Sequence, residues 1–175
     1  RVEAPYRALF DTILDAQDGV RTPHGCATFA VALSEMQVLK QKRKHYAWYV
    51  WPTLSILRPA TKFPEFLLPN LDAFQMYLWN RTLRSRVLSI TDATISAASA
   101  RSGGVGGTDA LIRVLGAVDE RKFHESITLL IVATVMTQGT CVCVCVCVFF
   151  CCHSYSSKTH THTTYRYITV EGKCI

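Results

Sequence analysis

The residues best suited to chemistry lie between Lys40 and Trp51, where a basic run passes directly into aromatic side chains. Basic side chains hold phosphate groups, and aromatic rings stack on bases. The pattern therefore favours a phosphate-bearing ligand: a nucleotide, a nucleotide derivative or a nucleic acid. Within this segment the expected ligand contacts are Lys42, Arg43, His45, Trp48 and Trp51.

The same aromatic segment also suits a protein core. In an extended chain, Tyr46, Trp48 and Val50 would point to one side, and the residues between them to the other. Large apolar side chains on both faces are typical of a segment buried on both sides. The sequence thus leaves open whether these rings line a ligand or fill the core.

A second basic group, with Arg84 and Arg86, lies near an expected helix start. It would add to an anion site if the fold places it beside Lys42 to His45, and otherwise it forms a solvated face. His45 is the first candidate for a general acid or base, because a histidine titrates near neutral pH. An enzyme that uses His45, with Arg84 or Arg86 holding an anion, is therefore an alternative to a binding domain.

Familiar catalytic templates are absent from the sequence: it has no phosphate-binding loop with Gly-Lys-Ser/Thr, no dinucleotide glycine fingerprint and no zinc-protease motif. The glycine-rich run of residues 103–107 lacks the lysine that a phosphate loop needs, so we expect it to connect two helices. The residues nominate neither a cofactor nor a metal site.

The elements that must position these residues belong to one domain. The chain has 175 residues, 49% of them hydrophobic, with nine glycines and six prolines. This composition suits a single buried core and excludes collagen-like and wholly disordered chains. The net charge of +6 favours anionic partners without identifying one. No secretory signal is visible in the first thirty residues, so we expect a cytoplasmic protein.

Helical periodicity dominates residues 4–137, and we expect a mainly α domain there, with a short strand-like or irregular segment near residues 45–52. The first helix should end at Asp18-Gly19, and the second should begin at Thr22-Pro23. Further helices should open near Asn70, Thr82, Thr108 and Asp119.

Residues 138–175 differ from the rest of the chain. They contain four Cys-Val units (141–148) and a Thr-His repeat, and repeated TG and CA dinucleotides would encode both. We therefore expect a translated repeat that is not part of the fold. Two alternatives remain: a membrane anchor over residues 127–152, and metal binding by the clustered cysteines with nearby histidines. Six of the eight cysteines lie within residues 141–152, which does not resemble a disulfide framework and favours a reducing compartment.

Several stretches together resemble the family known as domain of unknown function 1810. The resemblance covers roughly residues 6–135 and is carried by Phe10, the stretch Asp15-Ala16-Gln17, the segment from His45 to Pro52, and residues 71–78, 83, 86, 109–116, 119, 122, 126, 128 and 129. It implies a mainly helical domain without an assigned activity. A copy of this family that has degenerated and lost independent function is therefore a third alternative, beside the binding domain and the enzyme.

Overall fold

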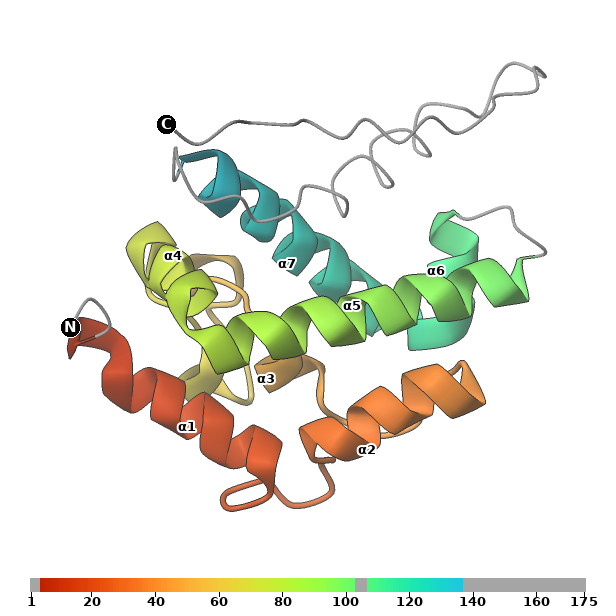
Figure 1. Cartoon of the computed structure of the whole chain (residues 1–175), viewed down its shortest axis with the longest axis horizontal. Helices are drawn as coiled ribbons and strands as arrows, with labels where there is room; N and C mark the ends of the chain where they lie inside the picture. Colours follow the sequence, from red (N-terminus) through yellow and green to blue (C-terminus); the bar gives the residue numbers. More distant parts are fainter. Residues whose placement is uncertain (1–3, 103–106, 137–175) are drawn as a thin grey trace.

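Seven α-helices account for most of the regular structure in residues 4–102 and 107–136, the part of the chain that this computed structural model describes (Figure 1). They are α1 (Arg7–Asp18), α2 (Phe29–Ser34), α3 (Ala47–Val50), α4 (Leu71–Trp79), α5 (Arg81–Arg101), α6 (Thr108–Leu115) and α7 (Ala117–Met136). Short helical turns are η1 (Ala4–Tyr6), η2 (Glu35–Leu39), η3 (Ser55–Leu57) and η4 (Pro64–Phe66). Only two isolated β-bridges occur in the described residues, so the expected mainly α fold is confirmed.

Helix α5 is the central element, and it crosses the middle of the molecule in Figure 1. It packs against α2, η2, α3, α4 and α6. One stripe of α5 repeats at the spacing of a helix face and is fully buried. The stripe consists of Leu83, Val87, Ile90, Thr94 and Ala97.

Several expected helix ends are confirmed. Helix α1 stops at Gly19, whose φ of 89° is a left-handed conformation that glycine adopts without strain. Asn70 caps α4, because its side-chain oxygen accepts the backbone N–H of Ala73 at 2.9 Å. Asn80 caps α5 in the same way, so this helix begins at Arg81, close to the expected start near Thr82.

The expected start of the second helix is wrong. The Thr22 hydroxyl donates to the carbonyl of Ala16 at 2.6 Å, so it closes the end of α1 and does not cap a new helix. Gly25 then turns the chain with a φ of 76°, and α2 begins only at Phe29. Its cap is Thr28, and its last turn widens into the π-helical turn η2.

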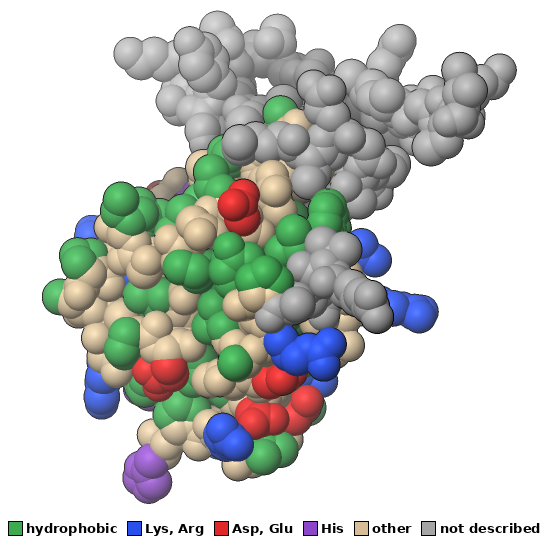
Figure 2. Space-filling view, turned by 90° about the vertical axis from the view of Figure 1, so that its left-hand side faces the viewer, with side chains coloured by type: hydrophobic (Ala, Val, Ile, Leu, Met, Phe, Trp, Pro, Cys, Tyr) green, Lys and Arg blue, Asp and Glu red, His purple; other side chains and the backbone are tan. Residues whose placement is uncertain are grey.

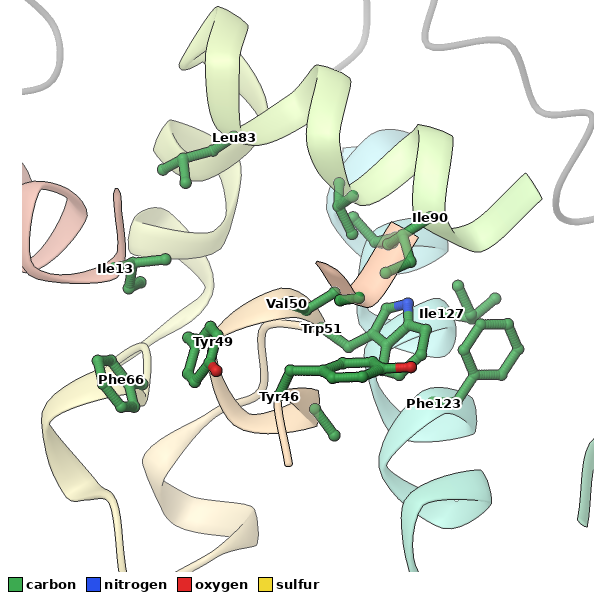
Figure 3. Close-up of a cluster of buried hydrophobic side chains, with 14 of the residues drawn as sticks. Ile13, Tyr46, Tyr49, Val50, Trp51, Phe66, Leu83, Ile90, Phe123 and Ile127 are labelled. Atoms are coloured by element: carbon green, nitrogen blue, oxygen red, sulfur yellow. The ribbon is translucent and has the colours of Figure 1, made fainter. Parts of the chain in front are cut away.

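Within the segment near residues 45–52, Ala47–Val50 form one turn of α-helix, α3, where a strand-like or irregular segment was expected. Backbone hydrogen bonds from Val50 to Tyr46 and from Trp51 to Ala47 close the turn, each at 3.2 Å. Figure 3 shows its aromatic side chains among hydrophobic residues from α1, α5 and α7. A helical turn fits here because the described residues offer no strand with which this segment could pair.

The face drawn in Figure 2 mixes hydrophobic and polar side chains, with Lys and Arg side chains toward its edges. The positive charge on this face is therefore scattered and does not form one broad patch. None of the described helices is sufficiently long and apolar for a membrane span. The membrane anchor that is the alternative for residues 127–152 lies partly outside the described residues. The clustered cysteines and the Thr-His repeat lie wholly outside them.

Candidate ligand-binding site

The segment that follows η2 is fixed by a buried carboxylate. Glu35 is 6% exposed, and its Oε2 accepts the backbone N–H of Arg43 at 2.9 Å and of Lys44 at 3.3 Å. The preceding backbone N–H, of Lys42, donates to the carbonyl of Val114 on α6 at 2.8 Å. These bonds hold the basic run in one conformation and connect it to the end of α6, directly before α7.

Two buried lysines share one carboxylate at this place. The ammonium of Lys42 lies 2.6 Å from Oδ2 of Asp119, and that of Lys122 lies 2.7 Å from Oδ1 of the same residue. The lysine side chains are only 6% and 8% exposed, and the aspartate side chain 15%. Burial acts to raise the pKa of Asp119, but the two ammonium groups outweigh it and the pKa is lowered. The carboxylate is therefore ionised between two cations.

Aromatic rings surround these cations. The Lys122 ammonium lies 3.7 Å from the centre of the Trp48 ring, and the Lys42 ammonium lies 4.9 Å from that of Tyr46. Ring faces carry negative potential, so both contacts stabilise the positive charge. Trp48 is half-buried, and its ring also packs against the ring of Phe63, with 5.9 Å between the two centroids.

A third lysine lies on the same side of the molecule. Lys62 is exposed, and its ammonium lies 5.7 Å from the centre of the Phe63 ring. Burial raises the pKa of the Cys26 thiol, while Tyr49 and the ammonium groups of Lys62 and Lys42 act in the opposite direction. Both lysines are therefore near this one thiol.

We call this group the lysine–aromatic site. It combines three lysines from three segments with two half-buried rings and a single bridging carboxylate. Its members are Lys42, Trp48, Lys62, Phe63, Asp119 and Lys122.

A buried hydroxyl lies beneath the site. Tyr46 is fully buried, and the nearby carboxylate of Glu35 interacts with its hydroxyl. Burial raises the pKa of this phenol, and the carboxylates of Glu35 and Asp119 raise it further. The phenol of Tyr46 is therefore neutral, and the Lys42 ammonium lies over its ring.

Of the residues predicted from the sequence, Lys42 and Trp48 come together, because Lys122 contacts the Trp48 ring and shares Asp119 with Lys42. Arg43 is exposed and follows Lys42 directly. The backbone of His45 forms a bridge with Cys26, its imidazole is exposed, and the described residues give that ring no hydrogen-bond partner. The role of His45 as an acid or base thus stays a prediction.

Trp51 lies in the core. Its side chain is 1% exposed, and its ring meets Phe123 edge-on at 5.2 Å (Figure 3). The indole N–H donates to the hydroxyl of Thr91 on α5 at 3.3 Å. The two tryptophans of this segment therefore differ, because Trp48 borders the surface and Trp51 does not.

Arg86 lies at a different place, where α5 meets α1 and α2. Its guanidinium donates to Gln17 at 3.0 Å and pairs with Asp18, and it lies 5.4 Å from the centre of the Phe29 ring. These contacts join α5 to the end of α1 and the start of α2. Arg84 is half-buried on the same helix, and the described residues give it no ion pair.

Sequence reasoning did not nominate Lys62, Phe63, Asp119 or Lys122. One local signal was present in α7: Asp119 and Lys122 lie on the same helical stripe as the buried Phe123 and Ser126. Charged residues on a buried stripe need partners, so this spacing indicates an internal ionic cluster. No local signal connected residues 62 and 63 to the basic run.

A shallow hollow of about 470 Å³ lies along α2 and η2, lined by Ala30, Val31, Ser34, Glu35, Val38 and Leu39. Its lining is mostly apolar and carries only one ionisable group. Within residues 4–102 and 107–136, no three His, Cys, Asp or Glu side chains are placed to hold a metal ion.

Comparison with known proteins gives one match. The family model described as "Protein of unknown function (DUF1810)" matches residues 11–161. Neither the curated proteins nor the solved structures gave a match. The matched range runs past residue 137 into the repeat-containing segment, and the expected domain boundary there stays a prediction. The match covers most of the chain and confirms the resemblance found in the sequence: this protein belongs to the DUF1810 family.

Proposed function

We propose that the lysine–aromatic site binds a phosphate-bearing ligand, namely a nucleotide or a nucleotide derivative. The observation that carries this proposal is the lysine pair. The ammonium groups of two lysines, whose side chains are 6% and 8% exposed, share the single charge of Asp119. Burying a cation without a full counter-charge is costly, so the cluster is complementary to an added anion.

Among the described ion pairs, neither Lys42 nor Lys122 is paired with Glu35. Its carboxylate accepts the backbone N–H groups of Arg43 and Lys44 and is directed at the loop. Lys62 adds a further positive charge near Cys26. The local balance over Lys42, Lys62, Lys122 and Asp119 is therefore positive, as an anion site requires.

The rings support a nucleotide over a bare anion. Trp48 and Phe63 are both half-buried and lie 5.9 Å apart, beside the lysines. A base stacks on any such ring because every base has a π face, and stacking contributes about 1–3 kcal/mol per base. An arrangement with the phosphate on the lysines and the base on the rings uses both the cations and the aromatic side chains of the site.

We further propose that this binding takes place in the cytosol. The clustered cysteines in residues 141–152 suit a reducing compartment better than an oxidising one. The alternatives of an enzyme that uses His45 and of a degenerate family copy stay predictions. Turnover of a bound nucleotide that is lost in His45→Ala would favour the enzyme.

Lys62 offers the mildest test of the site, because it is exposed and its replacement leaves the core intact. We expect Lys62→Gln to weaken nucleotide binding about two- to fivefold, as for the loss of one exposed ion pair. The measurement is the rise in unfolding temperature of the full chain with AMP and with UMP. A ligand at 100 times its dissociation constant adds about 2.7 kcal/mol, which is a shift of several degrees.

Arg7→Gln is the matched control, since Arg7 is an exposed cation at the start of α1. This variant should bind like the wild-type chain. Equal weakening in both variants would mean that only the overall charge matters. No shift with either nucleotide in the wild-type chain would contradict the proposed function.

A further inference from the structure

The position of Asp119 carries an inference beyond general phosphate binding. Its two carboxylate oxygens are divided between the two ammonium groups, one oxygen for each lysine. Two oxygens on one central atom, each facing a separate ammonium, is also how a phosphate group would be held. The carboxylate thus fills the place in which the proposed ligand would put its charge.

We infer that Asp119 is an internal occupant of this place, that it is displaced when the ligand binds, and that the site therefore selects terminal phosphate monoesters over phosphodiesters. This inference rests on the proposed function. It names mononucleotides as the ligand class, and it excludes the internal phosphates of RNA and DNA.

The selection of monoesters over diesters follows from the charge that each brings to the two lysines. A phosphate monoester carries close to two negative charges above its second pKa of about 6. When it replaces the single charge of Asp119, the two buried ammonium groups become fully neutralised. A phosphodiester carries one charge, so its exchange with the carboxylate would bring no gain in charge balance. The cost of displacing Asp119 is then not offset.

The burial of the two lysines also favours a terminal phosphate over an internal one. The side chains of Lys42 and Lys122 are 6% and 8% exposed, so the ligand group must enter among protein atoms to reach both. A terminal phosphate projects from its nucleotide and can enter in this way. An internal phosphate has a sugar on both sides, and these sugars would have to be buried with it.

The side chain of Asp119 can rotate away from the two lysines. It is the third residue of α7, in the first turn, where the helix dipole stabilises a negative charge. Its side chain is already 15% exposed, so rotation towards solvent does not cross the core. The next acidic residue, Glu120, is paired with His124 at 2.8 Å and does not compete for the lysines.

The test is titration calorimetry of the full chain at a pH of about 7.5 with AMP, UMP, their 3′,5′-cyclic forms, and the two nucleosides. The cyclic forms keep base and sugar but carry a singly charged diester. We expect the wild-type chain to bind the monophosphates at least about tenfold more tightly than the cyclic forms. In Asp119→Asn the cyclic forms should bind more tightly than in wild type, so the preference for the monophosphates should shrink.

Asp109→Asn is the matched control, because Asp109 is an exposed acid in the first turn of another helix, α6. It should keep the wild-type preference. Equal affinity of the wild-type chain for both ligand forms would overturn the inference while the proposed function stands. An unchanged preference in Asp119→Asn would also overturn it. If none of the phosphorylated ligands binds, the proposed function fails and the inference fails with it. If Asp119→Asn does not fold, the preference of the wild-type chain decides.

Discussion

Replacing Trp51 by alanine is expected to lower the free energy of unfolding by about 3–5 kcal/mol. The side chain is 1% exposed and contacts the rings of Phe123 and Tyr46, with centroids 5.2 Å and 6.2 Å away. Its removal would leave a cavity between α3, α5 and α7. The buried hydroxyl of Thr91 would also lose the indole N–H that it accepts.

Urea unfolding measured by circular dichroism tests this expectation, with Trp79→Ala as the matched control. Trp79 is 40% exposed at the end of α4, so its loss should cost less than about 1 kcal/mol. Trp51→Ala as mild as the control would contradict the core role of this ring. It would then favour the interpretation in which Trp51 lines a ligand.

Asp119→Asn is expected to destabilise the chain by about 3 kcal/mol. The substitution leaves two buried ammonium groups without a counter-charge, and breaking a buried pair costs about 3–5 kcal/mol. The lower end applies because the amide oxygen still accepts one hydrogen bond. Asp92→Asn, on the exposed side of α5, is the control and should be near neutral.

The effect of Asp119→Asn should depend on pH. The pKa of Asp119 in the folded chain is lowered from its ordinary value of 3.8, so the ionised carboxylate stabilises the fold. This stabilisation is fully present well above pH 3.8 and is lost as the pH falls through the lower, folded value. The difference in unfolding free energy between wild type and Asp119→Asn should therefore shrink below a pH of about 4. A difference that is constant from neutral to acid pH would contradict the ionic role.

Local signals in the sequence predicted much of the fold. Gly19 ends α1 because its backbone takes a positive φ, and Asn70 begins α4 because its side chain caps the first turn. The same reasoning failed at Thr22, whose hydroxyl closes the preceding helix. A threonine can serve either helix, and only the path of the chain between the two decides which.

The site was partly predictable for a related reason. Lys42 and Trp48 stand close together in a basic-aromatic run, which is a local pattern. Asp119 and Lys122 come from a helix more than seventy residues away, and only packing places them beside that run. Alternation along the chain put Trp48 and Trp51 on opposite faces but could not say which ring is buried. The segment is a helical turn, so burial follows the neighbours of each ring.

The most direct test of the nucleotide site uses the three tryptophans as reporters. Trp48 borders the lysine–aromatic site, Trp51 lies in the core, and Trp79 is exposed on α4. In the ¹⁵N-labelled full chain, each indole N–H gives its own NMR signal, which single substitutions assign. Titration with AMP or UMP should shift the Trp48 signal to saturation and leave the Trp79 signal in place. Binding that leaves the Trp48 signal unmoved, or no binding at all, would contradict a nucleotide site at the lysine pair.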